Sequence, residues 1–253
     1  MREAEAKSDN ARILYDADVV AYALNDWFEP KRLTARGWLI GSAMGRGHAH
    51  FFRYNGTDYV LRHYRRGGKI GPLFNDRYLW TGINSNRAWR EWRLLARLTE
   101  LDLPAPRPLA ARVIRNGLFY RADLITARIP AASSLAQRLK AGALPNDTWR
   151  EIGRVIRRFH EVCVWHADLN AHNVLLDSKG AVVLIDFDGA RFRKTGTRWR
   201  QANLARLLRS LRKLKRQDLN FRFCDAHFDL LRAGYDACSK SQLQAREIPR
   251  RKR

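Results

Sequence analysis

The sequence predicts an α+β protein with two lobes, in which an antiparallel-sheet N-terminal lobe precedes a mainly helical C-terminal lobe. Three observations predict this class. The 253 residues exceed one average domain of about 150 residues. Short runs of aromatic and β-branched residues, separated by glycine-containing turns, fill the first half. Helical periodicity dominates after Pro130.

The chain is expected to divide into four segments. They are an irregular lead-in over residues 1–37, an N-terminal lobe over 38–128, a C-terminal lobe over 129–240 and a basic tail over 241–253. The hinge between the lobes is expected near residues 127–131, where the strand-like runs give way to helical periodicity.

The first lobe is expected to follow the order β-β-β-α-β-β. Glycine-containing turns at residues 45–47 and at Asn55-Gly56 separate the first three strands, and Asn-Gly is the strongest short hairpin signal. Pro104, Pro106 and Pro108 exclude helix and predict an extended connection. The strands are predicted over residues 38–44, 49–54, 59–64, 113–114 and 118–126, and the helix over 86–101.

The second lobe is expected to begin with a long amphipathic helix. Thr148 followed by Glu151 resembles a capping box at its start. The helix is predicted to end near Val164, with one apolar face formed by Ile152, Val155, Ile156, Phe159 and Cys163. A hairpin over residues 174–185 and further helix from about residue 199 complete the lobe.

The charge balance predicts a polyanionic partner. The chain has 48 Lys and Arg against 25 Asp and Glu, a net charge of +23, which suits nucleic acid, an anionic membrane or a phosphorylated substrate. Residues 187–223 hold twelve Lys and Arg against two Asp and Glu. Leucines share one helical face there and cations fill the rest, as in helices that bind anionic membranes. The alternative is that the leucines pack the core and the cations are only solvated.

A polar constellation follows the long helix. Asp168 and Asn173 lie in a short loop before the predicted hairpin, and Asp186 ends its second strand. This arrangement is expected to collect two carboxylates and an amide close enough to share a divalent ion. Phosphoryl transfer uses such a set, one carboxylate for the proton of the attacking hydroxyl and hard oxygen ligands for Mg²⁺. The alternative is a polar loop whose side chains cap turns.

The pattern HxDxxxxN, with DFxG thirteen positions further on, resembles the catalytic and metal-binding motifs of the protein-kinase-like superfamily. The resemblance implies a bilobal kinase-like fold with ATP and Mg²⁺ between the lobes. It implies that Asp168 is the catalytic base and that Asn173 and Asp186 are magnesium ligands. His166 is expected to bond the backbone near Asp186.

The resemblance also implies nucleotide contacts in the first lobe. Gly45, Arg46 and Gly47 lie where kinases place a glycine-rich loop, although the segment does not match GxGxxG and an ordinary hairpin turn is the alternative. Arg62 occupies the position of the strand lysine, so either Arg62 or another cation serves the phosphates. Glu91 is its expected ion-pair partner, and a solvated helix charge is the alternative.

The closer resemblance is to a carbohydrate-acting branch. The triplet Ala-Pro-Glu of protein kinases is absent after Gly189, and residues 103–108 are similar to the linker of aminoglycoside-type phosphotransferases. Residues 59–68, 166–173 and 198–212 resemble the 3-deoxy-D-manno-octulosonic acid (Kdo) kinase family of lipopolysaccharide biosynthesis. This implies ATP-dependent phosphorylation of a Kdo hydroxyl, position 4 in the family, on a Kdo–lipid A precursor.

The same resemblance implies a peripheral protein on the cytoplasmic side of the inner membrane, with the anionic membrane surface as a partner. The basic patch over residues 63–69 is a candidate site for substrate anions. Two alternatives stay open. One is another kinase, acting on a heptose, an antibiotic or a protein, or a pseudokinase if Arg62 cannot replace lysine. The other is a basic nucleic-acid-binding module, which we do not expect because no zinc finger or RNP signature is present.

Overall fold

A computed structural model describes residues 1–8, 10–22, 25–43, 49–65 and 76–237. The chain forms two compact units. The first contains Met1–Pro130 and the segment Asp186–Ala190, and the second contains Ala131–Ile185 and the chain from Arg191 onward. The sequence did not predict that Asp186–Ala190 belongs to the first unit, because these residues lie within the segment 129–240 that was expected to form the second lobe. This placement brings a short stretch of the DFxG motif into contact with the N-terminal sheet.

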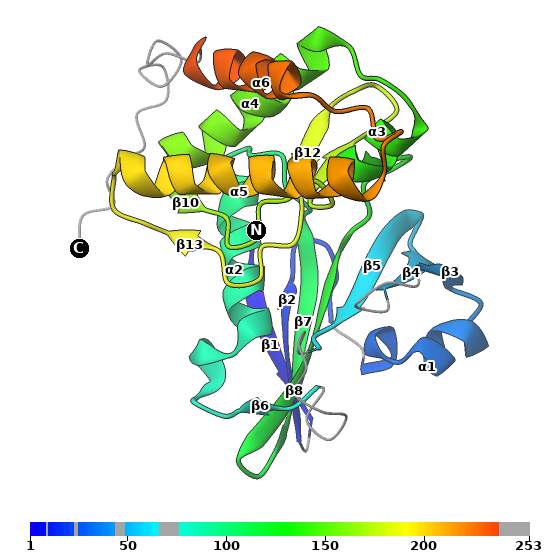
Figure 1. Cartoon of the computed structure of the whole chain (residues 1–253). Coiled ribbons are helices and arrows are strands. Elements are labelled where there is room, and N and C mark those ends of the chain that lie inside the picture. The colour runs from blue at the N-terminus through cyan, green and yellow to red at the C-terminus, as the bar shows by residue number, and fades with distance from the viewer. Residues whose placement is uncertain (9, 23–24, 44–48, 66–75, 238–253) are drawn as a thin grey trace. The chain divides into compact units, whose positions relative to one another are not determined.

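The first unit is built on one antiparallel sheet in the order β1-β2-β7-β8-β5-β4-β3, with β6 paired to β8 (Figure 1). The predicted α+β class with an N-terminal antiparallel sheet is therefore confirmed. The strands are β1 (Glu3–Lys7), β2 (Ala11–Asp16), β3 (Leu39–Ala43), β4 (Ala49–Tyr54), β5 (Thr57–His63), β6 (Tyr78–Leu79), β7 (Pro108–Asn116) and β8 (Phe119–Ala127).

The predicted irregular lead-in is wrong, because most of it is regular structure. β1 pairs with β2, and β2 pairs with β7 from Ala11 opposite Ile114 to Tyr15 opposite Ala110. A 3₁₀ turn (Asn25–Phe28) and α1 (Pro30–Ala35) follow. The strand β2 thus pairs on one side with its neighbour β1 and on the other with β7, about a hundred residues further along the chain, and it is mostly buried in the sheet.

The predicted turn at Asn55-Gly56 and the predicted helix of the first unit are confirmed, whereas the turn predicted at residues 45–47 lies outside the described residues. Asn55 and Gly56 both have positive φ, 48° and 76°, as the two-residue turn between β4 and β5 requires. The helix α2 (Arg87–Glu100) begins after Asn86, whose side chain accepts a hydrogen bond from the Trp89 backbone nitrogen. Its buried face packs mainly on β7 and includes Ala88, Trp89, Trp92, Leu95 and Leu98.

The second unit is mainly helical. Two of its helices, α4 (Asn146–Glu161) and α6 (Asp225–Ala237), cross closely at a pair of glycines (Figure 1). A Cβ on Gly153 would lie 2.0 Å from the Leu231 carbonyl oxygen, and one on Gly234 would lie 2.1 Å from that of Arg150. The remaining elements are β9 (Ser133–Ser134), α3 (Leu135–Ala141), β10 (Val164–Trp165), β11 (Val174–Leu176), β12 (Val182–Leu184), β13 (Arg191–Phe192) and α5 (Thr197–Gln217).

The predicted capping box at Thr148 is wrong. Pro145 is extended and the helix α4 starts at Asn146, without a side-chain cap. A capping box instead begins α3, where Ser134 and Gln137 bond each other's backbone nitrogens. The helix α4 also ends three residues earlier than predicted, because Cys163 takes a positive φ of 62°.

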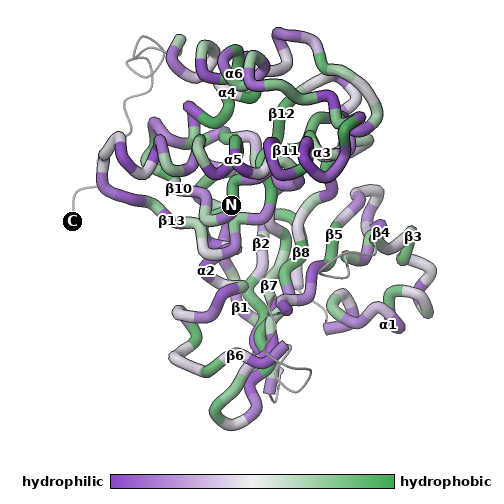
Figure 2. The backbone as a smooth tube through the Cα atoms, viewed as in Figure 1, coloured by the Kyte–Doolittle hydropathy of each residue, from purple (hydrophilic) through white to green (hydrophobic). Residues whose placement is uncertain are grey.

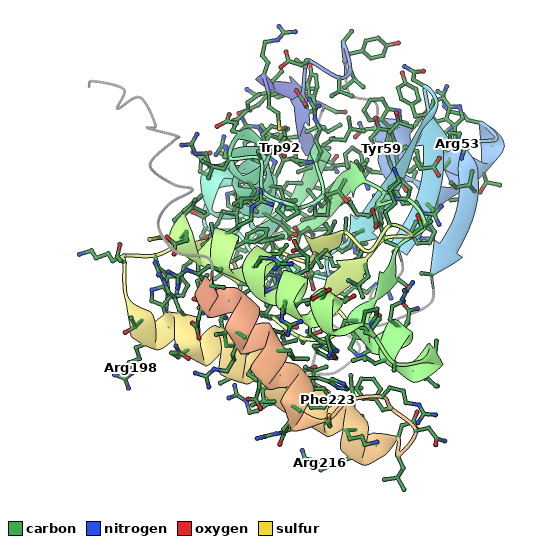
Figure 3. All side chains as sticks on the ribbon, turned by 90° about the horizontal axis from the view of Figure 1, so that it is seen from above. Arg53, Tyr59, Trp92, Arg198, Arg216 and Phe223 are labelled. Atoms are coloured by element: carbon green, nitrogen blue, oxygen red, sulfur yellow. The ribbon has the colours of Figure 1, made fainter. Side chains whose placement is uncertain are left out.

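The helix α5 has the two faces that the sequence predicts. Leu204, Leu207 and Leu211 are buried and belong to the core, whereas Leu208 and Leu214 are half-buried. The cations Arg198, Arg209, Lys213 and Arg216 are exposed. Figure 2 shows hydrophilic and hydrophobic residues alternating along α5, and Figure 3 places Arg198 and Arg216 near its two ends.

Candidate functional site

The loop that carries Asp168 is held by buried hydrogen bonds on both sides of His166. His166 Nε2 lies 2.9 Å from the Ile185 carbonyl oxygen, as predicted, and its Nδ1 accepts from the Asp168 backbone nitrogen at 3.1 Å. The Asn203 side chain from α5 accepts from His166 N and donates to His166 O. These bonds fix His166 as the neutral Nε2–H tautomer and set the start of the loop.

The Asp168 carboxylate is half-exposed and is bound by an arginine of the same unit. Arg206 on α5 donates to Asp168 Oδ1 from Nε at 3.0 Å and from Nη2 at 2.6 Å. Partial burial raises the pKa of Asp168, but the hydrogen bonds from Arg206 and Asn170, with the Arg206 charge, outweigh it and hold the pKa below its ordinary value. The carboxylate is therefore ionised at neutral pH.

Asn173 is buried and joins the loop to the end of the β11–β12 hairpin. Its Nδ2 donates to the Asp168 backbone oxygen at 2.9 Å, which leaves the amide oxygen as its remaining polar atom. The backbone carbonyl oxygen of Asn173 accepts a hydrogen bond from the Ile185 backbone nitrogen at 3.0 Å. Asp186 follows Ile185 directly in the chain.

Asp186 belongs to an ion-pair network of the first unit that is centred on Arg62. One Arg62 nitrogen donates to Glu91 Oε1 on α2, and another donates to Asp186 Oδ1. Glu91 is only 3% exposed and also accepts from the Tyr64 hydroxyl at 2.5 Å. The expected pairing of Arg62 with Glu91 is therefore confirmed, and a solvated Glu91 is excluded.

The electrostatics of this network follow from its burial. Desolvation raises the pKa of Glu91 above its ordinary value, and the Arg62 charge lowers it only in part. Asp186 has a φ of 62°, a left-handed conformation that Asp tolerates better than most residues. Arg62 thus presents a fixed guanidinium between two carboxylates, with a quarter of its side chain exposed.

A second arginine holds the same short segment. Arg87, at the start of α2, donates from Nε to Asp188 Oδ1 at 2.9 Å and from Nη2 to Asp188 Oδ2. Its guanidinium also lies over the Tyr78 ring, 4.9 Å from the centroid. The segment from Asp186 to Ala190 is therefore tied to the first unit by two arginine–carboxylate pairs.

Some predicted site residues are outside the described part of the chain. Gly45, Arg46 and Gly47 lie there, as do residues 66–69 of the basic patch that was predicted over residues 63–69. Within the described residues of that patch, His63 lies 2.6 Å from Asp123 Oδ1, and this contact raises its pKa. The described residues contain no group of three or more His, Cys, Asp and Glu side chains that is able to hold a metal ion by itself.

Comparison with known proteins decides the family. Residues 31–235 match the family model described as the lipopolysaccharide kinase (Kdo/WaaP) family. The chain belongs to this family. As a lipopolysaccharide kinase it is a phosphotransferase with a hydroxyl acceptor, and the resemblance inferred from its motifs is confirmed.

Curated relatives of this lipopolysaccharide kinase cover most of its length. A 3-deoxy-D-manno-octulosonic acid kinase of Photobacterium profundum is 40% identical over 90% of this chain and 96% of the relative. Kinases of the same name from Stenotrophomonas maltophilia and Xylella fastidiosa are 46% and 42% identical. They cover 80% and 88% of this chain and 81% and 89% of their own lengths.

The fold of this lipopolysaccharide kinase is also found among solved structures. A structure of WaaP in complex with acyl carrier protein matches with a TM-score of 0.53 and 15% identity, over 84% of each chain. The likeness concerns the fold, and it supports the predicted kinase-like fold.

Three interactions of the kinase site were not predicted from the sequence. They are the pairs Arg206–Asp168 and Arg87–Asp188 and the bonds from Asn203 to His166. Asn203 carries one usable signal, because it is a polar residue on the otherwise apolar face of α5. Nothing in the sequence distinguishes Arg206 or Arg87, since each is one of many cations in a basic stretch.

Proposed function

We propose that the chain transfers the γ-phosphoryl group of ATP to a hydroxyl of the Kdo residue on a Kdo–lipid A precursor, the hydroxyl at position 4 by family resemblance. The observation that carries this proposal is the Arg62 network. A strand cation that bridges a buried helix glutamate and the aspartate of DFxG is an arrangement suited to nucleotide phosphates. The names of the curated relatives support Kdo as the acceptor.

Arg62 is the proposed phosphate ligand of the first unit. Glu91 and Asp186 each take one of its terminal nitrogens and thereby fix the plane of the guanidinium. A planar guanidinium matches phosphate oxygens and stays charged at every relevant pH. Glu91 therefore acts on the nucleotide through Arg62. Gly45, Arg46 and Gly47 remain the proposed loop over the phosphates.

Asp186 and Asn173 fit a magnesium ion by the chemistry of their free atoms. Asp186 Oδ1 accepts from Arg62, and Oδ2 remains. The Asn173 amide nitrogen is used by the Asp168 backbone oxygen, so the amide oxygen is the atom left for a cation. Mg²⁺ prefers such hard oxygen ligands together with substrate phosphates. When bound, it would neutralise charge on the transferring phosphates.

Asp168 is the proposed base. In the reaction, the acceptor hydroxyl oxygen forms a bond to the γ-phosphorus, the bond from that phosphorus to the bridging oxygen breaks, and ADP leaves. The hydroxyl proton passes to the Asp168 carboxylate. Arg206 occupies Oδ1 and leaves Oδ2 for the hydroxyl. Because Arg206 lowers the pKa of Asp168, the carboxylate is ready to orient the hydroxyl and takes the proton late, as suits a loose transition state.

We infer a peripheral location on the cytoplasmic side of the inner membrane. The exposed cations of α5 suit the Kdo carboxylate, the phosphates of lipid A and anionic phospholipids, each cation adding about 1 kcal/mol near such a surface. In the described residues, helices long and apolar enough to cross a bilayer are absent.

The test is transfer of radiolabelled phosphate from ATP to purified Kdo–lipid A precursor in the presence of Mg²⁺. We expect label on the lipid, none on lipid A that lacks Kdo, and release as Kdo phosphate on mild acid hydrolysis. Labelling of a heptose-containing or aminoglycoside acceptor, but not of the Kdo lipid, would show that the enzyme acts on a different class of acceptor. An absence of transfer to any of these acceptors would remove the proposal.

A further inference from the structure

The turn between β7 and β8 carries an exposed apolar side chain, Leu118, which the turn geometry does not require. Asn116 pairs with Phe119, so Gly117 and Leu118 form a two-residue turn, and Gly117 has the positive φ of 59° that its first position requires. The second position usually holds a small or polar residue. Leu118 stands there with 71% of its surface exposed.

A second exposed leucine lies on the neighbouring strand. Leu79 of β6 is 57% exposed and pairs with Phe119 of β8, and the Trp80 nitrogen donates to the Leu118 carbonyl oxygen at 2.8 Å. Single exposed apolar side chains are ordinary, but two beside a tryptophan at one hairpin end form a patch. We call Leu79, Trp80 and Leu118 the hairpin end.

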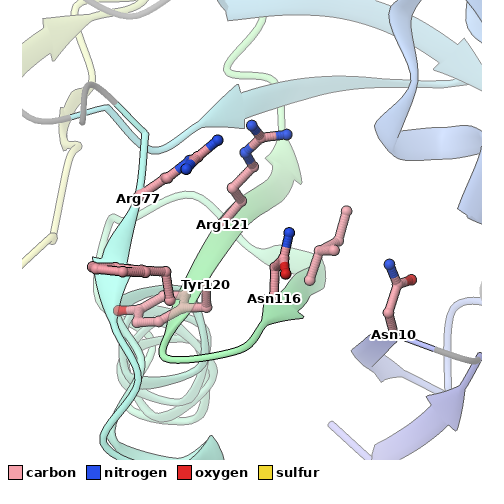
Figure 4. Close-up of a pocket in the computed structure, with 7 residues that line it drawn as sticks. Asn10, Arg77, Asn116, Tyr120 and Arg121 are labelled. Carbon is pink, nitrogen blue, oxygen red and sulfur yellow. The ribbon is translucent and has the colours of Figure 1, made fainter. Parts of the chain in front are cut away.

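Cations surround the hairpin end. Tyr78 pairs with Tyr120, so Arg77 and Arg121 face each other across the two strands (Figure 4). Like charges opposed in this way are destabilising unless an anion offsets them. Arg121 has Asp76 at 2.9 Å, whereas Arg77 has no acidic partner within the described residues.

A hollow lies beside these two arginines. The hollow has a volume of about 310 Å³ and is lined by Arg77, Arg121, Asn116, Asn10, Ile114, Phe119 and Tyr120. Figure 4 shows Arg77 and Arg121 beside each other there, with Asn116 and Asn10 further along. On the other side of the turn, Arg115 lies over the Trp80 ring, 5.1 Å from its centroid, and its Nε donates to the Gly117 carbonyl oxygen. The guanidinium groups are thus next to the exposed leucines.

We propose that the hairpin end docks on a bilayer that contains anionic lipid. Leu79 and Leu118 enter the interface, Trp80 lies at the level of the headgroups, and Arg77, Arg115 and Arg121 contact lipid phosphates. Apolar side chains flanked by cations bind bilayers in this way, and tryptophan favours the interface. Charge complementarity selects this occupant over a neutral apolar partner. The inference deepens the proposed function, since it gives the first unit its own membrane contact, separate from α5.

The test is co-sedimentation of the full chain with vesicles of phosphatidylcholine, alone or mixed with phosphatidylglycerol. We expect binding to the mixed vesicles and little to phosphatidylcholine alone. The variant L79S/L118S should bind about tenfold more weakly because the apolar contact is lost. The variant R77Q/R121Q should also lose about tenfold. The matched control is Tyr22→Ser, because Tyr22 is 64% exposed and follows the opposite end of β2.

Urea unfolding curves like that of the wild type establish that the variants are folded. Wild-type binding by both double variants, or equal binding to neutral vesicles, would overturn the proposal. So would loss of binding only in an α5 variant, K213Q/R216Q. Phosphoryl transfer to a water-soluble Kdo acceptor without vesicles should be the same in L79S/L118S and wild type. Failure of that transfer in the wild type would count against the proposed function and leave the docking result intact.

Discussion

Arg206 donates two hydrogen bonds to a single carboxylate oxygen of Asp168. This relationship joins the loop after α4 to the basic helix α5 and gives one of the many cations of that helix a particular partner. Arg206 lowers the pKa of Asp168 and fixes which of its two carboxylate oxygens remains for an acceptor. The basic helix therefore has a role beside the proposed base as well as on the surface.

Substitution of Arg206 should change the pH dependence of catalysis. In Arg206→Gln the pKa of Asp168 should rise, because the charge and hydrogen bonds that lower it are gone. The acidic limb of kcat/KM should therefore move to higher pH, and kcat should fall by about tenfold or more. Arg206→Lys should retain part of the effect. The control is Arg209→Gln, because Arg209 lies about one turn later on the exposed face of α5. An unchanged pH profile in Arg206→Gln would show that Arg206 does not set the pKa of Asp168.

Removal of Arg62 should destabilise the first unit in a pH-dependent way. Arg62→Ala leaves Glu91 buried without its cation, at a cost of about 3 kcal/mol in the free energy of unfolding near neutral pH. The pKa of Glu91 is already raised in the folded protein, and it should rise further in the variant. A raised folded pKa gives stability that is present at low pH and lost as pH rises through it. The defect should therefore shrink towards pH 5, as urea unfolding at several pH values will measure.

The double variant R62A/E91Q is the control for that experiment. It removes the buried charge, so its stability should depend less on pH than that of Arg62→Ala. An Arg62→Ala defect that is the same at pH 5 and pH 8 would mean that Glu91 is not the group left uncompensated.

The Arg87–Asp188 pair should support nucleotide binding by positioning the segment that carries Asp186. Arg87→Gln and Asp188→Asn should each raise the KM for ATP, and the double variant should be little worse than either single one. A double-mutant cycle should give a coupling energy of about 1–2 kcal/mol. The matched control is Arg90→Gln, which lies on the same helix and is exposed. Additive effects of the two substitutions would show that the pair does not act as a unit.

The crossing of α4 and α6 should not tolerate a methyl group. Gly234→Ala should lower the free energy of unfolding by about 3 kcal/mol or more, since the added Cβ would overlap the Arg150 backbone and the helices must separate. Gly142→Ala is the control, because its φ is 177° and nothing lies within 4 Å of the added Cβ. Equal urea midpoints for the two variants would contradict the close crossing.

The sequence predicted the parts of this molecule that local chemistry controls. The Asn55-Gly56 turn, the helix predicted over residues 86–101 and the leucine face of α5 depend on neighbours within a few residues. Asp168, Asn173 and Asp186 were recognisable because their spacing matches the HxDxxxxN and DFxG motifs of kinases. His166 was correctly expected to bond the backbone beside Asp186.

The rest depends on contacts between distant parts of the chain. The strand β2 has β1 on one side, but its other neighbour, β7, lies about a hundred residues further along the chain. With 48 Lys and Arg in the chain, every carboxylate has many possible partners, and only the fold selects Arg206 for Asp168 or Arg87 for Asp188. The capping box was misplaced for a simpler reason, because α4 already begins at Asn146, directly after Pro145, and Thr148 lies inside the helix.

The magnesium proposal has a separate test. Asp186→Ala should lose magnesium-dependent nucleotide binding, measured as the change in ATP affinity between Mg²⁺ and EDTA by calorimetry. Asp177→Ala is a control on the same hairpin, since the Asp177 side chain bonds only the backbone of its turn among the contacts described. Unchanged magnesium dependence in Asp186→Ala would remove its role as a ligand.

The role of Asp168 is tested most directly by single-turnover phosphoryl transfer from ATP to the Kdo–lipid A precursor, with wild type and Asp168→Ala compared at saturating ATP and Mg²⁺. We expect the transfer rate of the variant to fall by about a thousandfold or more, with ATP affinity and the urea midpoint close to those of the wild type. Transfer within a few fold of the wild-type rate would contradict the assignment of Asp168 as the base.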